Sequence, residues 1–115
     1  MVIDFNQARS KHTFFRTRVR GFLLGSEADP DTFKAYLREL GAWVEALATR
    51  YHLEEDEVLE ANYLHSEMTA KTEALIKCWD AGRETEARER FQEMETTGKE
   101  FLTILSRLEQ KTKKI

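Results

Sequence analysis

The sequence predicts an all-α protein, folded as an antiparallel up-down-up-down bundle of four helices. Apolar residues recur at steps of three and four along nearly the whole chain, and no segment shows the strict alternation of a half-buried strand. Only one proline and five glycines interrupt this pattern. At 115 residues the chain has room for one domain, covering residues 1–115. The expected helices cover residues 4–24, 30–51, 54–80 and 84–111.

The first expected helix carries both a start signal and a stop signal. Asp4 is the expected N-cap, and Gly25 stands where a helix commonly ends in the left-handed conformation. Phe14 and Leu23 are expected to widen its apolar face. The residues that form this face are Phe5, Ala8, His12, Phe15, Val19 and Phe22.

The second helix is expected to start at Asp29-Pro30, an N-cap followed by a proline whose missing N–H is not needed in the first turn. Gly41 lies inside this helix and costs it about 1 kcal/mol relative to alanine, which indicates close packing or a local irregularity. Trp43 lies beside the apolar face. That face comprises Phe33, Leu37, Leu40, Val44, Leu47 and Tyr51.

Acidic residues 54–57 precede the third apolar face, where the helix dipole favours negative charge. Residues 80–83, which include Gly82, are expected to end this helix. Its face comprises Val58, Ala61, His65, Met68, Thr72, Leu75 and Trp79. The face of the fourth helix comprises Ala87, Phe91, Met94, Gly98, Phe101, Leu105 and Leu108.

Two histidines stand among these apolar residues, His12 on the first helix and His65 on the third. A buried imidazole without a partner costs about 1–3 kcal/mol, so each needs a hydrogen-bond acceptor, a water or a metal. Two interpretations are open. Each can be an ordinary core residue, with Thr72 or Asn62 as a hydrogen-bond partner, or the two can be ligands of one shared metal site. His52, near the second loop, is expected to be exposed.

A complete zinc site is disfavoured, because zinc takes four ligands, or three and a water. Cys78 lies about three and a half turns beyond His65, roughly 20 Å along the helix, too far to share one ion with it. Glu60 and Glu67 lie off the apolar face. The paired Glu-x-x-His signature of di-iron bundles is missing. We therefore expect no cofactor. Zinc is the one candidate that the two histidines suggest, and the missing ligands disfavour it.

Several segments of the chain resemble the motifs of one known family. The first helix carries His12 and closes at Gly25, residues 40–43 read Leu-Gly-Ala-Trp, and residues 59–65 read Leu-Glu-Ala-Asn-Tyr-Leu-His. These segments resemble the chemoreceptor zinc-binding domain of bacterial chemoreceptors and diguanylate cyclases, over nearly the whole chain. The resemblance implies a four-helix bundle. In that family zinc is held by a histidine of the first helix, a cysteine in a Cys-x-Leu/Phe-Gly-x-Trp motif, and a His-x-x-x-His pair.

Carried over onto this chain, the resemblance places His12 and His65 at two of the four ligand positions. Arg38 stands where the family has its cysteine, and Ala61 where it has the first histidine of the pair. Arginine is no metal ligand and its fixed charge repels cations. The altered pocket, with Arg38, Ala61 and Trp43, could offer donors to an anion or a small acidic ligand. The alternative is that the site has decayed and that Arg38 points to solvent.

The function that we expect is a non-enzymatic sensory or regulatory module with a lost or altered metal site. The resemblance implies signal transduction in bacterial chemotaxis, with output through a separate protein. The alternative is a structural or protein-interaction bundle without a ligand, with a homodimer as one form of it. In this alternative the basic first helix meets the acidic start of the third within one bundle or between chains. The sequence has no nucleophile with a positioned base and no phosphate-binding glycine loop, so we expect no enzyme.

Composition narrows the expected partners and location. The formal net charge of −3 favours neither nucleic acid nor an acidic membrane. No apolar stretch approaches the roughly 20 residues that cross a bilayer, so we expect no direct membrane insertion. Cys78 is the only cysteine, which fits a reducing compartment, and the first residues lack the pattern of a signal peptide. We therefore expect a cytoplasmic protein.

Overall fold

A computed structural model describes residues 4–25, 29–51 and 56–113 of the chain. These residues form four helices and no strand, which confirms the predicted all-α class. The predicted bounds are correct to within one or two residues, although residues 54 and 55 lie outside the described part. The helices are α1 (Phe5–Leu23), α2 (Pro30–Tyr51), α3 (Asp56–Asp80) and α4 (Glu84–Thr112).

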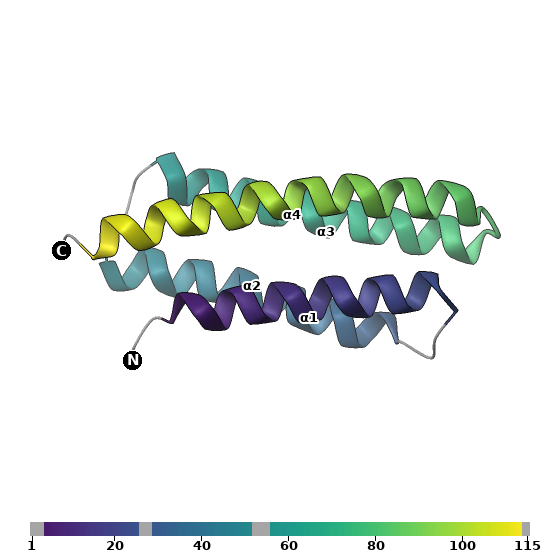
Figure 1. Cartoon of the computed structure of the whole chain (residues 1–115), viewed down its shortest axis with the longest axis horizontal. Helices are drawn as coiled ribbons and strands as arrows, with labels where there is room; N and C mark the ends of the chain where they lie inside the picture. The colour runs from purple at the N-terminus through teal and green to yellow at the C-terminus, as the bar shows by residue number, and fades with distance from the viewer. Residues whose placement is uncertain (1–3, 26–28, 52–55, 114–115) are drawn as a thin grey trace.

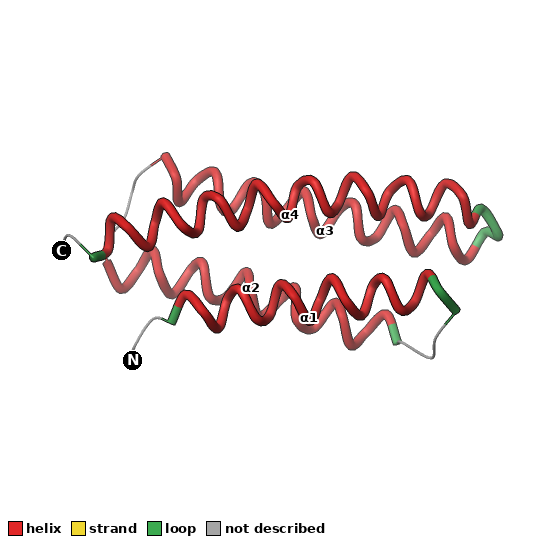
Figure 2. The backbone as a smooth tube through the Cα atoms, in the orientation of Figure 1, coloured by secondary structure: helices red, strands yellow, loops and turns green. Residues whose placement is uncertain are grey.

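The helices lie alongside one another, in an elongated arrangement of 49 × 23 × 17 Å (Figure 1). The most extensive contact joins α3 to α4, followed by α1 to α2, and smaller contacts join α1 to α4 and α2 to α3. These contacts are consistent with a bundle. The start of α1 and the end of α4 lie at the same end of the molecule, and the described loops are short (Figure 2).

None of the described helices is sufficiently long and apolar to pass through a membrane.

The predicted helix boundaries are confirmed where the structure describes them. The Asp4 carboxylate accepts a hydrogen bond from the Asn6 backbone N–H at 2.9 Å, as an N-cap does. Asp29 accepts one at 3.0 Å from the backbone N–H two residues further on. Gly25 and Gly82 have φ of +83° and +78°, the left-handed conformation that glycine adopts without steric cost. Local sequence therefore sets where α1 and α3 end.

Most of the predicted apolar faces are buried, but their rotation about the helix axis is wrong at several positions. Phe14 is 53% exposed rather than packed in the core, and its ring lies 5.8 Å from that of Tyr36 at the surface. Phe22 is half-buried, since Leu23 occupies the core at the end of α1. The side chain of Tyr51 and the whole of His52 lie outside the described part of the chain.

The apolar face of α3 is turned toward α4. Leu64 and Cys78 are buried, whereas His65 and Trp79, which the sequence places on the buried face, are only half-buried. Leu64 lines a groove together with Thr96 of α4 and other residues of that helix. Because α3 packs most extensively against α4, the residue facing α4 is drawn inward and His65 is left nearer the edge.

The basic residues of α1 do not pair with the acidic start of α3 in the described part of the chain. Three of them pair with α4 and α2 instead. The contacts are Arg9–Glu109 at 2.8 Å, Arg16–Glu95 at 3.3 Å and Lys11–Glu39 at 2.6 Å. Glu57, at the start of α3, binds Lys111 of α4 at 2.9 Å. Both charged regions therefore have partners on α4 of the same chain.

Candidate functional site

His12 lies in the contact between α1 and α4. Its side chain is 6% exposed, and its ring lies directly over Gly98 of α4. A Cβ atom added at Gly98 would be 2.5 Å from the Nε2 atom of His12, so the contact leaves no room for a side chain. Among the described residues, no hydrogen bond reaches this imidazole. Gly98 is therefore what lets the two helices approach with a histidine between them.

The surroundings of His12 disfavour its protonated form. Burial lowers the pKa of His12, and the positive charge of Arg16 lowers it further. The carboxylate of Glu95 acts in the opposite direction, but Glu95 is itself paired with Arg16 at 3.3 Å. The balance keeps a neutral imidazole in the core.

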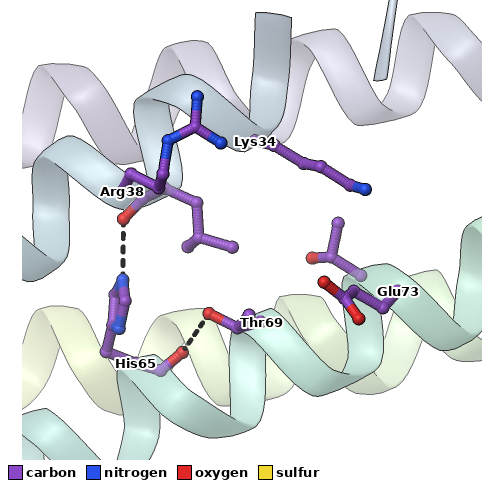
Figure 3. Close-up of a pocket in the computed structure, with 7 residues that line it drawn as sticks. Lys34, Arg38, His65, Thr69 and Glu73 are labelled. Carbon is purple, nitrogen blue, oxygen red and sulfur yellow. Dashed lines mark hydrogen bonds between the residues drawn. The ribbon is translucent and has the colours of Figure 1, made fainter. Parts of the chain in front are cut away.

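His65 makes the corresponding contact between α3 and α2. A Cβ atom added at Gly41 of α2 would be 2.8 Å from the Cε1 atom of His65, so the predicted close packing at Gly41 is confirmed. The Nε2 atom lies 2.7 Å from the backbone oxygen of Leu37 (Figure 3). A carbonyl oxygen only accepts, so Nε2 carries the hydrogen. Neither expected partner is used, because Thr72 donates to the Met68 backbone oxygen at 2.7 Å and Asn62 is exposed.

The two histidines thus contact different helices, and their contacts do not converge on a set of ligands. Within residues 4–25, 29–51 and 56–113, no three histidine, cysteine, aspartate or glutamate side chains come together as a group that could hold a metal. Cys78 is buried on α3 and is a free thiol.

Two of the three residues of the predicted altered pocket, Ala61 and Trp43, are buried in the core. Ala61 is fully buried in the core. Trp43 is buried edge-on against Phe5, with ring centroids 5.0 Å apart, and its indole N–H has no hydrogen-bond partner among the described residues. Arg38 is exposed, as the alternative of a solvent-facing Arg38 requires, and it lines one cavity together with His65.

This cavity lies between α2 and α3 and has a volume of about 310 Å³. Figure 3 shows that residues of α2 form one wall and residues of α3 the other. Its lining residues are Lys34, Leu37, Arg38, His65, Thr69, Thr72 and Glu73. The sequence pointed to Arg38 and His65 but not to Lys34, Thr69 or Glu73. The signal available for Lys34 was its four-residue spacing from Arg38, which places both cations on one face of α2.

The charged residues of the cavity are not paired with one another. Lys34, Arg38 and Glu73 take part in no ion pair with any residue that the structure describes, unlike Arg9, Arg16 and Lys11 of α1. Two cations against one carboxylate leave the lining with one positive charge in excess. The arrangement can therefore attract and hydrogen-bond a small anionic group.

A comparison of the chain with protein-family models, with curated proteins and with solved structures finds no match.

Proposed function

We propose that this protein is a non-enzymatic sensory or regulatory module that binds a small acidic ligand in the cavity between α2 and α3. The observation that carries the proposal is the pair of cations Lys34 and Arg38, one turn apart on α2. Both line the cavity, and neither has an ion-pair partner in the described part of the chain. Arg38 is exposed and Lys34 is half-buried, so both lie at the open side of the cavity. Arginine and lysine beside a cavity are the usual means of holding a carboxylate or a phosphate.

Binding at this position would act on one of the looser contacts of the fold. The contact between α2 and α3 is smaller than those of α1 with α2 and of α3 with α4. A ligand that bridges the two walls would bind more tightly to the state in which the walls are close. This difference in affinity between the two states is what shifts the protein toward the closed one. We further propose that the four helices form an antiparallel up-down-up-down bundle. In that arrangement a movement of α2 relative to α3 is transmitted along the length of the bundle.

Kinship with chemoreceptor zinc-binding domains is part of the proposal. It is supported by a histidine over a glycine at two helix contacts, and by Arg38 beside His65 at the position where that family has its cysteine. We infer that the ancestral metal site is altered, that the module works in the cytoplasm, and that a separate signalling protein provides the output.

Isothermal titration with acetate, inorganic phosphate, glutarate and zinc tests the proposal. At least one of the acids should bind, and Arg38→Gln should weaken it by about tenfold, the loss expected for one charge-assisted hydrogen bond. Arg18→Gln is the matched control, because Arg18 is exposed on α1 away from the cavity. Absence of heat with every acid, or an equal loss in both variants, would contradict the proposal. Tight zinc binding would instead favour a retained metal site.

The second candidate function is a protein-interaction bundle that forms a homodimer. Leu59 and Tyr63, one turn apart on α3, are 66% and 62% exposed, and large apolar side chains gathered on a surface are typical of interaction sites. Sedimentation equilibrium distinguishes the candidates. A dimer that Leu59→Glu dissociates would favour this second function, and a monomer at all concentrations would remove it.

A further inference from the structure

The two walls of the α2–α3 cavity differ in their hydrogen-bonding chemistry. The charged groups on the α2 wall, Lys34 and Arg38, are donors only, because neither an ammonium nor a guanidinium accepts hydrogen bonds. Leu37 adds an apolar residue to this wall. The α2 wall is therefore suited to acidic groups.

The polar side chains of the α3 wall are left mainly as acceptors. Thr69 donates its hydroxyl hydrogen to the His65 backbone oxygen at 3.1 Å, and Thr72 donates to the Met68 backbone oxygen at 2.7 Å. The N–H of His65 is bound to the Leu37 backbone oxygen at 2.7 Å. Glu73 is exposed and has no ion-pair partner among the described residues, and its carboxylate is an acceptor only. The α3 wall is therefore suited to a group that donates, and its carboxylate favours a positive one.

A simple polyanion would satisfy one wall and be repelled by the other. In Figure 3, Lys34 extends from α2 on the side of the cavity where Glu73 projects from α3. A ligand that meets both walls must carry opposite charges on separate atoms. The volume of about 310 Å³ is at the small end of ligand pockets, so such a ligand has few atoms.

We propose that the ligand is a small zwitterionic amino acid with a second carboxylate. This inference rests on the proposed acidic-ligand function and narrows its chemical class. The ammonium group is held by Glu73, and the carboxylates are held by Lys34 and Arg38. A ligand with one net negative charge also matches the single positive charge that the lining has in excess.

Titration with L-glutamate and glutarate tests this class, because the two molecules differ only in the ammonium group. The native protein should bind glutamate at least about tenfold more tightly than glutarate, as expected for one charge-assisted contact. In Glu73→Gln the preference should be lost, since glutamate binds more weakly and glutarate no longer meets a carboxylate. Glu89→Gln, at an exposed position of α4, is the matched control and should leave the preference unchanged.

The outcomes separate this inference from the proposed function. If glutarate, acetate or phosphate binds at the Arg38 site as tightly as glutamate, the zwitterion is wrong and the acidic-ligand function stands. If none of these probes binds, both are wrong. If glutamate is preferred but Glu73→Gln does not change the preference, the assignment of the ammonium group to this cavity is overturned. Circular dichroism of each variant establishes that it is folded.

Discussion

Two histidine–glycine contacts of the molecule have the same construction but differ in burial and hydrogen bonding. They are His12 over Gly98 and His65 over Gly41. In both, an imidazole lies over a glycine of the neighbouring helix, closer than any side chain would allow. Between α1 and α4 the histidine is buried and has no hydrogen bond to a described residue. Between α2 and α3 it is half-buried, bound to a backbone oxygen, and beside a cavity.

Charge distribution separates the two contacts further. Two ion pairs, Arg9–Glu109 and Arg16–Glu95, cross from α1 to α4. No ion pair crosses from α2 to α3 in the described part of the chain, and Lys34 and Arg38 line the cavity there without a partner. A closed contact with its charges matched is suited to stability. An open contact with unmatched charges has interactions left for a ligand.

The largest predicted difference between the two contacts comes from filling each glycine. Gly98→Ala places a Cβ atom 2.5 Å from a buried ring, and we expect it to lower the free energy of unfolding by about 1–2 kcal/mol. Gly41→Ala should cost less, because His65 lies beside a cavity into which its ring can turn. Both variants gain about 1 kcal/mol from the higher helix propensity of alanine. The difference between their free energies of unfolding in urea therefore reports the difference between the two histidine–glycine contacts.

A double variant provides the control for this prediction. His12→Ala together with Gly98→Ala removes the clash, so the two substitutions should cost less together than the sum of their separate costs. If Gly41→Ala destabilises the protein as much as Gly98→Ala, the α2–α3 contact is as closed as the α1–α4 contact, and the comparison fails.

The second prediction concerns pH. Burial and Arg16 lower the pKa of His12 in the folded protein, so the unfolded chain binds a proton more readily. Stability from this group is complete above the unfolded pKa, near 6.5, and decreases as pH falls below it, by at most about 1.4 kcal/mol per pH unit for one proton. His12→Leu should remove this component of the slope in denaturant unfolding measured from pH 7 to pH 5. An unchanged slope in that variant would show that His12 is not the group responsible.

The sequence predicts the parts of this comparison that depend on local chemistry. Helix positions follow from apolar spacing, and the capping roles of Asp4, Gly25 and Asp29 follow from side-chain and backbone preferences that act within a few residues. Both histidines could be identified because a titratable group among apolar residues stands out. Close packing at Gly41 could be predicted because a glycine inside a helix needs a reason.

Features that depend on helix rotation and on pairing between helices could not be predicted. Whether Phe14 is buried or exposed depends on the rotation of α1 about its own axis. Apolar residues spaced by three and four define that rotation only to within about one residue position. The cavity is lined by Lys34 of α2 and Glu73 of α3, and the local sequence around either residue does not predict that the two lie near one cavity. Likewise, Arg9 can find an acid on any helix, and only the packed arrangement selects Glu109.

The smallest predicted effect compares a paired arginine with an unpaired one. Arg9 donates to Glu109 at 2.8 Å, which raises the pKa of Arg9 and lowers that of Glu109. Arg9→Met removes the pair and should cost about 0.2–1 kcal/mol, the usual range for partly exposed ion pairs. Arg38→Met removes a cation without an ion-pair partner among the described residues, so it should change stability by less than about 0.5 kcal/mol. Thermal unfolding in low and high salt measures both. The cost at Arg9 should shrink with salt, and a larger loss at Arg38 than at Arg9 would mean that Arg38 is a structural residue rather than one left free for a ligand.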